Sequence, residues 1–212
     1  HAELMKARPG YGFLGEEGGQ REGVDKTHTW IVDPLDGTTN FLHGIPQFAI
    51  SIGLERESTV VAGLIYNPAN DEMFVAERGK GAFLNDQRIR VAARKRLADA
   101  VVACGLPHHG RGDIELSRKE AGAMQEQVAG LRRFGAAALD LAWVAAGRLD
   151  GYWERDVNAW DVAAGVILVR EAGGFVTDCD GGDNIFGKKH IVAGNEAVQK
   201  ELVSVLKKAG KS

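Results

Sequence analysis

The sequence predicts a layered α+β fold, in which an antiparallel strand meander in the first half of the chain is followed by alternating strands and helices. Apolar residues recur at every second position through residues 47–55, which is the spacing of a strand. From residue 114 onward the spacing becomes helical. No long linker or internal repeat separates the halves, so we expect two sheets that share one cleft.

The composition excludes several other classes of protein. Glycine makes up 28 of the 212 residues without a three-residue period, which excludes collagen and predicts many tight turns. The net charge of −3 argues against a nucleic-acid coat or a general binder of anionic membranes. No apolar run reaches the ~18 residues of a membrane span. Cys104 and Cys179 lie far apart and predict free, buried thiols in a reducing cytoplasm.

The first half predicts short strands joined by turns. Ala2, Leu4 and Met5 are spaced like the last turns of an amphipathic helix. The apolar run at residues 29–32 stops at Asp33-Pro34, so it predicts a strand that ends in a loop. Further elements are expected as strands at residues 47–55, 60–66 and 73–76, turns at 67–71, 79–81 and 85–86, and a new apolar segment at 97–104.

The second half predicts mainly helices. They are expected at residues 114–128, 136–146, 161–172 and 195–208. Gly147 and the pair Gly173-Gly174 follow two of them as C-terminal stops. The lysines near the end of the last helix suit the negative end of its dipole.

The strongest chemical signal is the segment 30–41, WIVDPLDGTTNF, where two aspartates three residues apart follow a strand. Pro34 stiffens the turn between them, so their oxygens suit hard cations such as Mg²⁺. The backbone N–H groups after Gly37 suit a phosphate. Taken alone, an Asp-x-x-Asp turn is more often a surface turn with a helix cap.

Two further acidic positions have similar alternatives. Glu16 and Glu17 stand in a glycine-flanked loop, which taken alone predicts a solvated surface loop. Asp161 opens a predicted helix, where an aspartate is usually a cap. Combined with the Asp33–Asp36 turn, these residues could form a multi-metal carboxylate site.

Together these motifs resemble the inositol monophosphatase family of Mg²⁺-dependent, lithium-sensitive phosphatases. The matching segments are residues 15–17, 30–41, 160–165 with 171–174, and 192–195, in the family's order and spacing. The resemblance covers essentially the whole chain and implies one domain over residues 1–212. It implies the layered αβαβα sandwich of the sugar phosphatases, with the metal motifs and meander in about residues 1–105 and an α/β half in about 106–212.

The resemblance also implies two or three Mg²⁺ ions and their ligands. Glu16, Asp33 and the carbonyl of Leu35 would hold the first ion. Asp33, Asp36 and Asp161 would hold the second. Glu16 would also help to place a third.

Other residues take supporting and substrate-binding roles by the same resemblance. Glu17 would support the metal site. Gly37 and Thr38 would bind the phosphate beside Asp36 and Asp161, and Thr38 would orient the attacking water. Glu154 would grip a substrate hydroxyl, and Gly135, Ala136 and Ala137 would line the pocket. The expected catalytic residues are Glu16, Asp33, Asp36, Thr38 and Asp161.

The implied reaction is hydrolysis of a small phosphorylated polyol, most plausibly myo-inositol 1-phosphate, without a covalent intermediate. Relatives act instead on fructose 1,6-bisphosphate, histidinol phosphate or 3′-phosphoadenosine 5′-phosphate. A carboxylate at Glu154 favours hydroxyl donors over a second phosphate. The family is commonly dimeric, so we expect a homodimer.

A regulatory role is an alternative. The segment 132–141 resembles the bacterial SuhB branch of the family, some members of which act in transcription complexes. The simpler interpretation of Arg132-Arg133 is a solvated strand end or a dimer contact.

Other apparent motifs predict no site. Residues 182–188 imitate a phosphate-binding loop, but Lys189 stands where Ser or Thr is needed. Residues 178–183 begin like a calcium loop, but Asp183 replaces its glycine. Both predict polar turns, and His108-His109 predicts loop surface.

One departure from the family concerns the N-terminus. The family has two N-terminal helices and an aspartate that pairs with the threonine at the position of Thr38. Here only fifteen residues precede Glu16, and none is Asp. The expectation is therefore a truncated chain that turns over poorly by itself.

Overall fold

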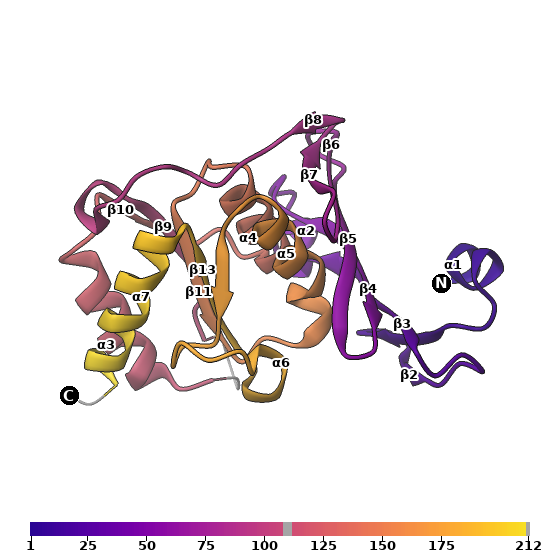
Figure 1. Cartoon of the computed structure of the whole chain (residues 1–212). Helices are drawn as coiled ribbons and strands as arrows, with labels where there is room; N and C mark the ends of the chain where they lie inside the picture. The colour runs from indigo at the N-terminus through magenta and orange to yellow at the C-terminus, as the bar shows by residue number, and fades with distance from the viewer. Residues whose placement is uncertain (108–111, 211–212) are drawn as a thin grey trace.

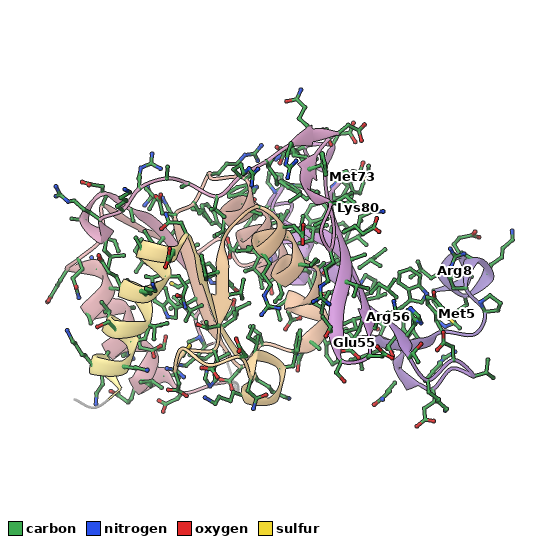
Figure 2. The ribbon with its side chains drawn as sticks, in the orientation of Figure 1. Met5, Arg8, Glu55, Arg56, Met73 and Lys80 are labelled. Carbon is green, nitrogen blue, oxygen red and sulfur yellow. The ribbon has the colours of Figure 1, made fainter. Side chains whose placement is uncertain are left out.

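The computed structural model describes residues 1–107 and 112–210 and confirms the layered α+β prediction (Figure 1). Two sheets and two pairs of helices alternate. The first sheet lies at the right of the figure, α4 and α5 pack between it and the second sheet, and α3 and α7 cover that sheet's far side. Figure 2 shows Met5 and Arg8 of the N-terminal segment beyond the first sheet, nearer to Glu55 and Arg56 than to Met73.

The first sheet contains eight strands in the order β2-β1-β3-β4-β5-β6-β7-β8. All neighbours are antiparallel except β1 and β3, which are parallel. Its strands are β1 (Gly12–Gly15), β2 (Gly19–Arg21), β3 (His28–Asp36), β4 (Ala49–Arg56), β5 (Thr59–Asn67), β6 (Glu72–Glu77), β7 (Gly81–Leu84) and β8 (Gln87–Arg88). The predicted meander is thus confirmed and extended at both ends. β1, β2, β7 and β8 were not predicted because they are too short to show a pattern. The prediction that the first strand ends in a loop at Asp33-Pro34 is wrong, because β3 continues to Asp36 through an irregularity in its ladder with β4.

The second sheet contains five strands in the order β10-β9-β11-β13-β12. Its strands are β9 (Val101–Cys104), β10 (Gly130–Arg132), β11 (Gly151–Arg155), β12 (Phe175–Thr177) and β13 (His190–Gly194). β9 runs parallel to both β10 and β11, while β13 runs antiparallel to β11 and β12. The predicted segment 97–104 divides into a 3₁₀ turn, η1 (Leu97–Asp99), and β9.

The predicted helices form within a few residues of the expected bounds. The helices are α1 (Ala2–Ala7), α2 (Thr38–Leu42), α3 (Ile114–Gln125), α4 (Ala137–Ala145), α5 (Ala159–Glu171), α6 (Ile185–Lys188) and α7 (Glu196–Ala209). The prediction of a polar turn over residues 182–188 is wrong at its end, because the Asn184 side chain accepts the Gly187 N–H and caps the short helix α6.

The turn over residues 178–183 is confirmed as a polar turn. One carboxylate oxygen of Asp178 accepts the N–H groups of Asp180 and Gly182, and the other lies 2.9 Å from the Lys188 ammonium. Cys104 and Cys179 are free and buried, as predicted. Within residues 1–107 and 112–210, no helix combines the length and apolarity that a bilayer crossing needs.

Two glycines of the first sheet face helix α5 and allow it to pack closely against the sheet. Gly53 of β4 and Gly63 of β5 are directly paired across the ladder. A Cβ atom at Gly63 would lie 2.8 Å from both the Cα and the carbonyl oxygen of Ala164. These are backbone atoms, so α5 itself would have to move.

Gly63→Ala is therefore expected to lower the free energy of unfolding by about 1–3 kcal/mol, the usual cost of overpacking a core. Gly122→Ala is the matched control, because Gly122 lies in α3 with nothing within 4 Å of an added Cβ. That control is expected to stabilise by about 0.5–1 kcal/mol. Urea unfolding of both variants checks the pair, and equal effects would contradict close packing of α5.

Candidate active site

Strand β3 brings two aspartates to one cavity. Regular alternation would place side chains three residues apart on opposite faces of a strand. The ladder between β3 and β4 is irregular between Asp33 and Asp36, and such a bulge re-aims side chains. Both aspartates consequently line the same cavity, whose volume is about 350 Å³.

Backbone N–H groups fix the orientation of each carboxylate. The Leu35 N–H donates to Asp33 Oδ1 at 2.8 Å, within the turn that Pro34 stiffens. The Ala138 N–H, in the first turn of α4, donates to Asp36 Oδ2 at 2.7 Å. Asp36 and Ala138 are 102 residues apart in the sequence. This hydrogen bond therefore connects the end of β3 to the helix layer.

Two more acidic residues reach the cavity from other elements. Asp161 lies in the first turn of α5, where its Oδ2 accepts the Asn158 N–H at 2.7 Å. Glu16 follows β1, and its own N–H donates to the Val32 carbonyl at 3.3 Å. Parallel pairing of β1 with β3 thus places Glu16 beside Asp33.

Most of the sequence-predicted site residues line this cavity, and two do not. Glu17 is exposed in the β1–β2 turn, and Ala136 is buried beneath Gly37. The predicted residues that line the cavity are Glu16, Asp33, Leu35, Asp36, Gly37, Thr38, Gly135, Ala137, Glu154 and Asp161.

Burial and mutual repulsion perturb the carboxylates. Burial, together with the charges of Glu16 and Asp161, raises the pKa of Asp33 to about 7, although the hydrogen bond from the Leu35 N–H opposes the shift. Burial also raises the pKa of Asp36 well above its usual range, and Asp33 adds to that effect. Negative charge is therefore concentrated here without enough compensating positive charge.

This donor set fits hard divalent cations. Carboxylate and carbonyl oxygens are the ligands that Mg²⁺ prefers, and a cation would relieve the repulsion that raises these pKa values. Within the described ranges, no three His, Cys, Asp or Glu side chains already meet as a ligand cluster. His108-His109 lies outside the described residues.

The loop after Asp36 has a conformation that suits glycine. Gly37 has a φ of +85° and is the N-cap of α2. An added Cβ would lie 2.8 Å from the Gln47 carbonyl oxygen, so a larger residue is excluded on two grounds. Thr38 follows, and its hydroxyl donates to the Leu35 carbonyl at 3.0 Å. Its oxygen can then still accept a hydrogen bond from a water in the cavity.

The cavity is also lined by residues that the sequence did not identify. Glu154 comes from β11 and is followed there by Arg155 and Asp156, which also line the cavity. Arg155 is paired with Glu120 of α3, through Nε at 2.9 Å. β11 is only five residues long, and Tyr152 and Glu154 are neighbours on one of its faces. So short a strand shows too little alternation to predict which of its residues face a cavity.

Arg132 and Arg133 lie in different environments, and only that of Arg132 matches a predicted one. Arg132 ends β10 and is exposed, as predicted for a solvated strand end. Arg133 is exposed too, but it reaches the rim of the cavity, where it lies beside Gly135. No motif in the sequence predicted this position for Arg133, which lies with Gly135 in the loop between β10 and α4.

The raised pKa values predict a pH-dependent response to Mg²⁺. The folded pKa of Asp33 lies above its unfolded value, so without metal the free energy of unfolding falls as pH rises from about 4 to about 7. Metal needs the deprotonated carboxylates. Mg²⁺ is therefore expected to raise the melting temperature more at about pH 8 than at about pH 5.5. An equal rise in melting temperature at both pH values would contradict this. So would a pH dependence of that rise in Asp33→Asn equal to that in the unchanged chain.

Comparison with known proteins identifies the family of the chain. The model of the inositol monophosphatase family matches residues 1–211. The chain is 60% identical to "Inositol-1-monophosphatase" of Mesorhizobium japonicum, over 98% of this chain and 78% of that protein. It is 44% identical to "Nus factor SuhB" of Pseudomonas aeruginosa, over 97% of this chain and 77% of that protein.

Solved structures agree as well. The extragenic suppressor protein suhB from Bartonella henselae superposes with a TM-score of 0.95 at 58% identity, over 98% of this chain and 80% of that one. Inositol monophosphate bound SaIMPase-II superposes with a TM-score of 0.85 at 26% identity, over 99% and 81%. The chain therefore belongs to the inositol monophosphatase family, a family of metal-dependent phosphatases.

Proposed function

We propose that this chain hydrolyses a small phosphomonoester with the help of Mg²⁺, and that myo-inositol 1-phosphate is the preferred substrate. One observation carries the proposal: four carboxylates, from β1–β2, β3 and α5, line a single cavity beside the loop that begins at Gly37. The inositol-1-monophosphatases among the relatives and the inositol monophosphate in a related structure support the choice of substrate.

The proposed ligand sets use every one of these carboxylates. Glu16, Asp33 and the Leu35 carbonyl take one ion. Asp33, Asp36 and Asp161 take a second, and Glu16 also helps to place a third. When bound, Mg²⁺ lowers the pKa of a coordinated water and neutralises charge on the phosphate.

Other residues bind and orient the reactants. Gly37 and Thr38 present backbone N–H groups to the phosphate, and the Thr38 hydroxyl, which donates to the Leu35 carbonyl, accepts a hydrogen bond from the attacking water and so orients it. A covalent intermediate is not required. Burial raises the pKa of the Cys104 thiol, near the cavity, to about 12, so it is not a thiolate nucleophile at neutral pH.

Glu154 selects the alcohol part of the substrate. A carboxylate accepts hydrogen bonds from hydroxyl groups and repels a second phosphate. Glu154 lines the same cavity as Gly37 and Thr38, so one cavity can hold both the phosphate and the polyol. This arrangement favours inositol 1-phosphate over fructose 1,6-bisphosphate and 3′-phosphoadenosine 5′-phosphate.

A phosphate-release panel tests the proposed function. The substrates are inositol 1-phosphate, fructose 1,6-bisphosphate, histidinol phosphate and 3′-phosphoadenosine 5′-phosphate, each with Mg²⁺, with EDTA, and with Mg²⁺ plus Li⁺. We expect the highest kcat/KM for inositol 1-phosphate, loss of activity in EDTA, and inhibition by Li⁺. A higher kcat/KM for a bisphosphate would overturn the assignment of substrate. Undiminished activity in EDTA would overturn the proposed requirement for Mg²⁺.

A regulatory function in transcription complexes is a second candidate. It is favoured by the 44% identity to a protein named "Nus factor SuhB" and by the two exposed arginines at the end of β10. The Asp36→Asn variant distinguishes the enzymatic function from the regulatory one. It is expected to lose phosphate release and to keep its protein–protein surface intact. An Arg132→Ala variant with normal phosphate release but lost association would favour the regulatory function.

A further inference from the structure

The carboxylate of Glu154 is held from behind by a buried tyrosine. The Tyr152 hydroxyl donates a hydrogen bond to Glu154 Oε2. Tyr152 has no exposed surface, whereas Glu154 is half-buried and lines the cavity. A substrate can therefore reach Glu154 but cannot reach Tyr152.

The register of β11 explains why these two residues meet. Side chains two residues apart lie on the same face of a strand. Tyr152 packs in the core between the two sheets, while the intervening Trp153 packs in the separate core beneath α3 and α7. The Tyr152–Glu154 pair therefore runs from the buried core between the sheets to the cavity.

Gly105 forms a second support. A Cβ atom at this position would lie 1.8 Å from Glu154 Cδ and within 2.2 Å of both carboxylate oxygens. The carboxylate thus occupies the space that any other residue at position 105 would fill. Gly105 is itself fixed, because its N–H donates to the Trp153 carbonyl at 3.1 Å.

A buried carboxyl on the neighbouring helix adds to this arrangement. Asp140 of α4 is 1% exposed, and its Oδ1 has no hydrogen-bond partner among the described residues. Burial, and then the charge of Glu154, raise the pKa of Asp140 well above its usual range. Burial thus favours the uncharged form of Asp140, and the orientation of the Glu154 carboxylate is set by donation from Tyr152 and by the space at Gly105.

We propose that Tyr152 is a positioning residue that fixes the Glu154 carboxylate for recognition of substrate hydroxyl groups, with Gly105 leaving the space that this orientation needs. This inference rests on the proposed role of Glu154. A carboxylate has about four acceptor sites, and the tyrosine uses one of them. A preorganised acceptor loses less freedom on binding, so the effect belongs in KM and not in the chemical step.

Tyr152→Phe tests the inference, because it removes only the hydroxyl. With Mg²⁺, we expect the KM for inositol 1-phosphate to rise about tenfold, as for loss of a hydrogen bond to a charged group, with kcat within about twofold. The KM for phenyl phosphate, which has no hydroxyl to recognise, is expected to stay unchanged. Tyr66→Phe is the matched control, because the Tyr66 hydroxyl donates to Asp71 on the exposed surface.

A double-mutant cycle shows whether Tyr152 acts through Glu154. In a Glu154→Gln background, Tyr152→Phe is expected to change the KM less than about twofold. An undiminished effect there, or equal KM changes for both phosphates, would overturn the inference and indicate a structural role. If Glu154→Gln itself leaves the KM for inositol 1-phosphate unchanged, the proposed role of Glu154 fails instead.

Gly105→Ala gives a second test that keeps the hydroxyl. Gly105 does not have a positive φ, so alanine fits the backbone, and the new methyl group displaces the flexible end of Glu154. The same selective rise in KM is expected, with an unchanged melting temperature. If Tyr152→Phe fails to fold, this variant decides, and an unchanged KM for inositol 1-phosphate would overturn the inference.

Discussion

Asp36→Asn is expected to lower kcat for phosphate release by more than about 100-fold, which is the upper range for loss of a residue that merely supports a metal ligand. Asparagine keeps an oxygen that can accept the Ala138 N–H, so the fold is expected to survive. It loses the negative charge, which in the proposed site holds the metal. Release of inorganic phosphate under saturating Mg²⁺ measures the change.

The same variant is expected to be more stable than the unchanged chain when metal is absent. Burial and the neighbouring Asp33 make the charged form of Asp36 costly, so removing that charge relieves strain on the folded state. Asp71→Asn, at a surface turn away from the cavity, is the control and should alter neither quantity. Full activity in Asp36→Asn would refute the metal assignment.

Asp161→Asn should also lower kcat more than about 100-fold while leaving stability within about 0.5 kcal/mol. The reason is that Asp161 has two separable roles. Its Oδ2 accepts the Asn158 N–H in the first turn of α5, which is a capping contact that asparagine can reproduce. Asparagine cannot reproduce the charge that the metal needs.

Asp161→Ala should lose both roles, so its activity should match that of Asp161→Asn and its stability should fall by about 1 kcal/mol. Asn195 supplies the matched control, because its side chain accepts the N–H groups of Ala197 and Val198 at the start of α7. Asn195→Ala should lose stability without losing activity. If Asp161→Asn retains normal kcat, Asp161 is a cap and nothing more.

The sequence predicted those parts of the fold that carry their own periodicity. β4 alternates buried and half-buried side chains, and α4, α5 and α7 are long enough to show a helical pattern. β10 and β12 are three residues long, so no periodicity develops within them. Their positions are determined by pairing with β9 and β13, which depends on contacts distant in sequence.

The candidate site shows the same division. Glu16, Asp33, Asp36 and Asp161 belong to recognisable motifs, and the structure brings all four to one cavity. The contact from Ala138 to Asp36 and the support of Glu154 by Tyr152 and Gly105 join segments separated by loops and whole helices. Tertiary packing creates these contacts, so no local pattern records them.

Calorimetric titration of the 212-residue chain with Mg²⁺, in two buffers of different ionisation enthalpy, tests the central claim most directly. We expect saturable binding with release of protons below about pH 7, because raised carboxylate pKa values must fall when metal binds. We also expect Asp33→Asn and Asp36→Asn to weaken the binding and reduce the proton release. Absence of Mg²⁺ binding, or binding unchanged in both variants, would contradict the central claim.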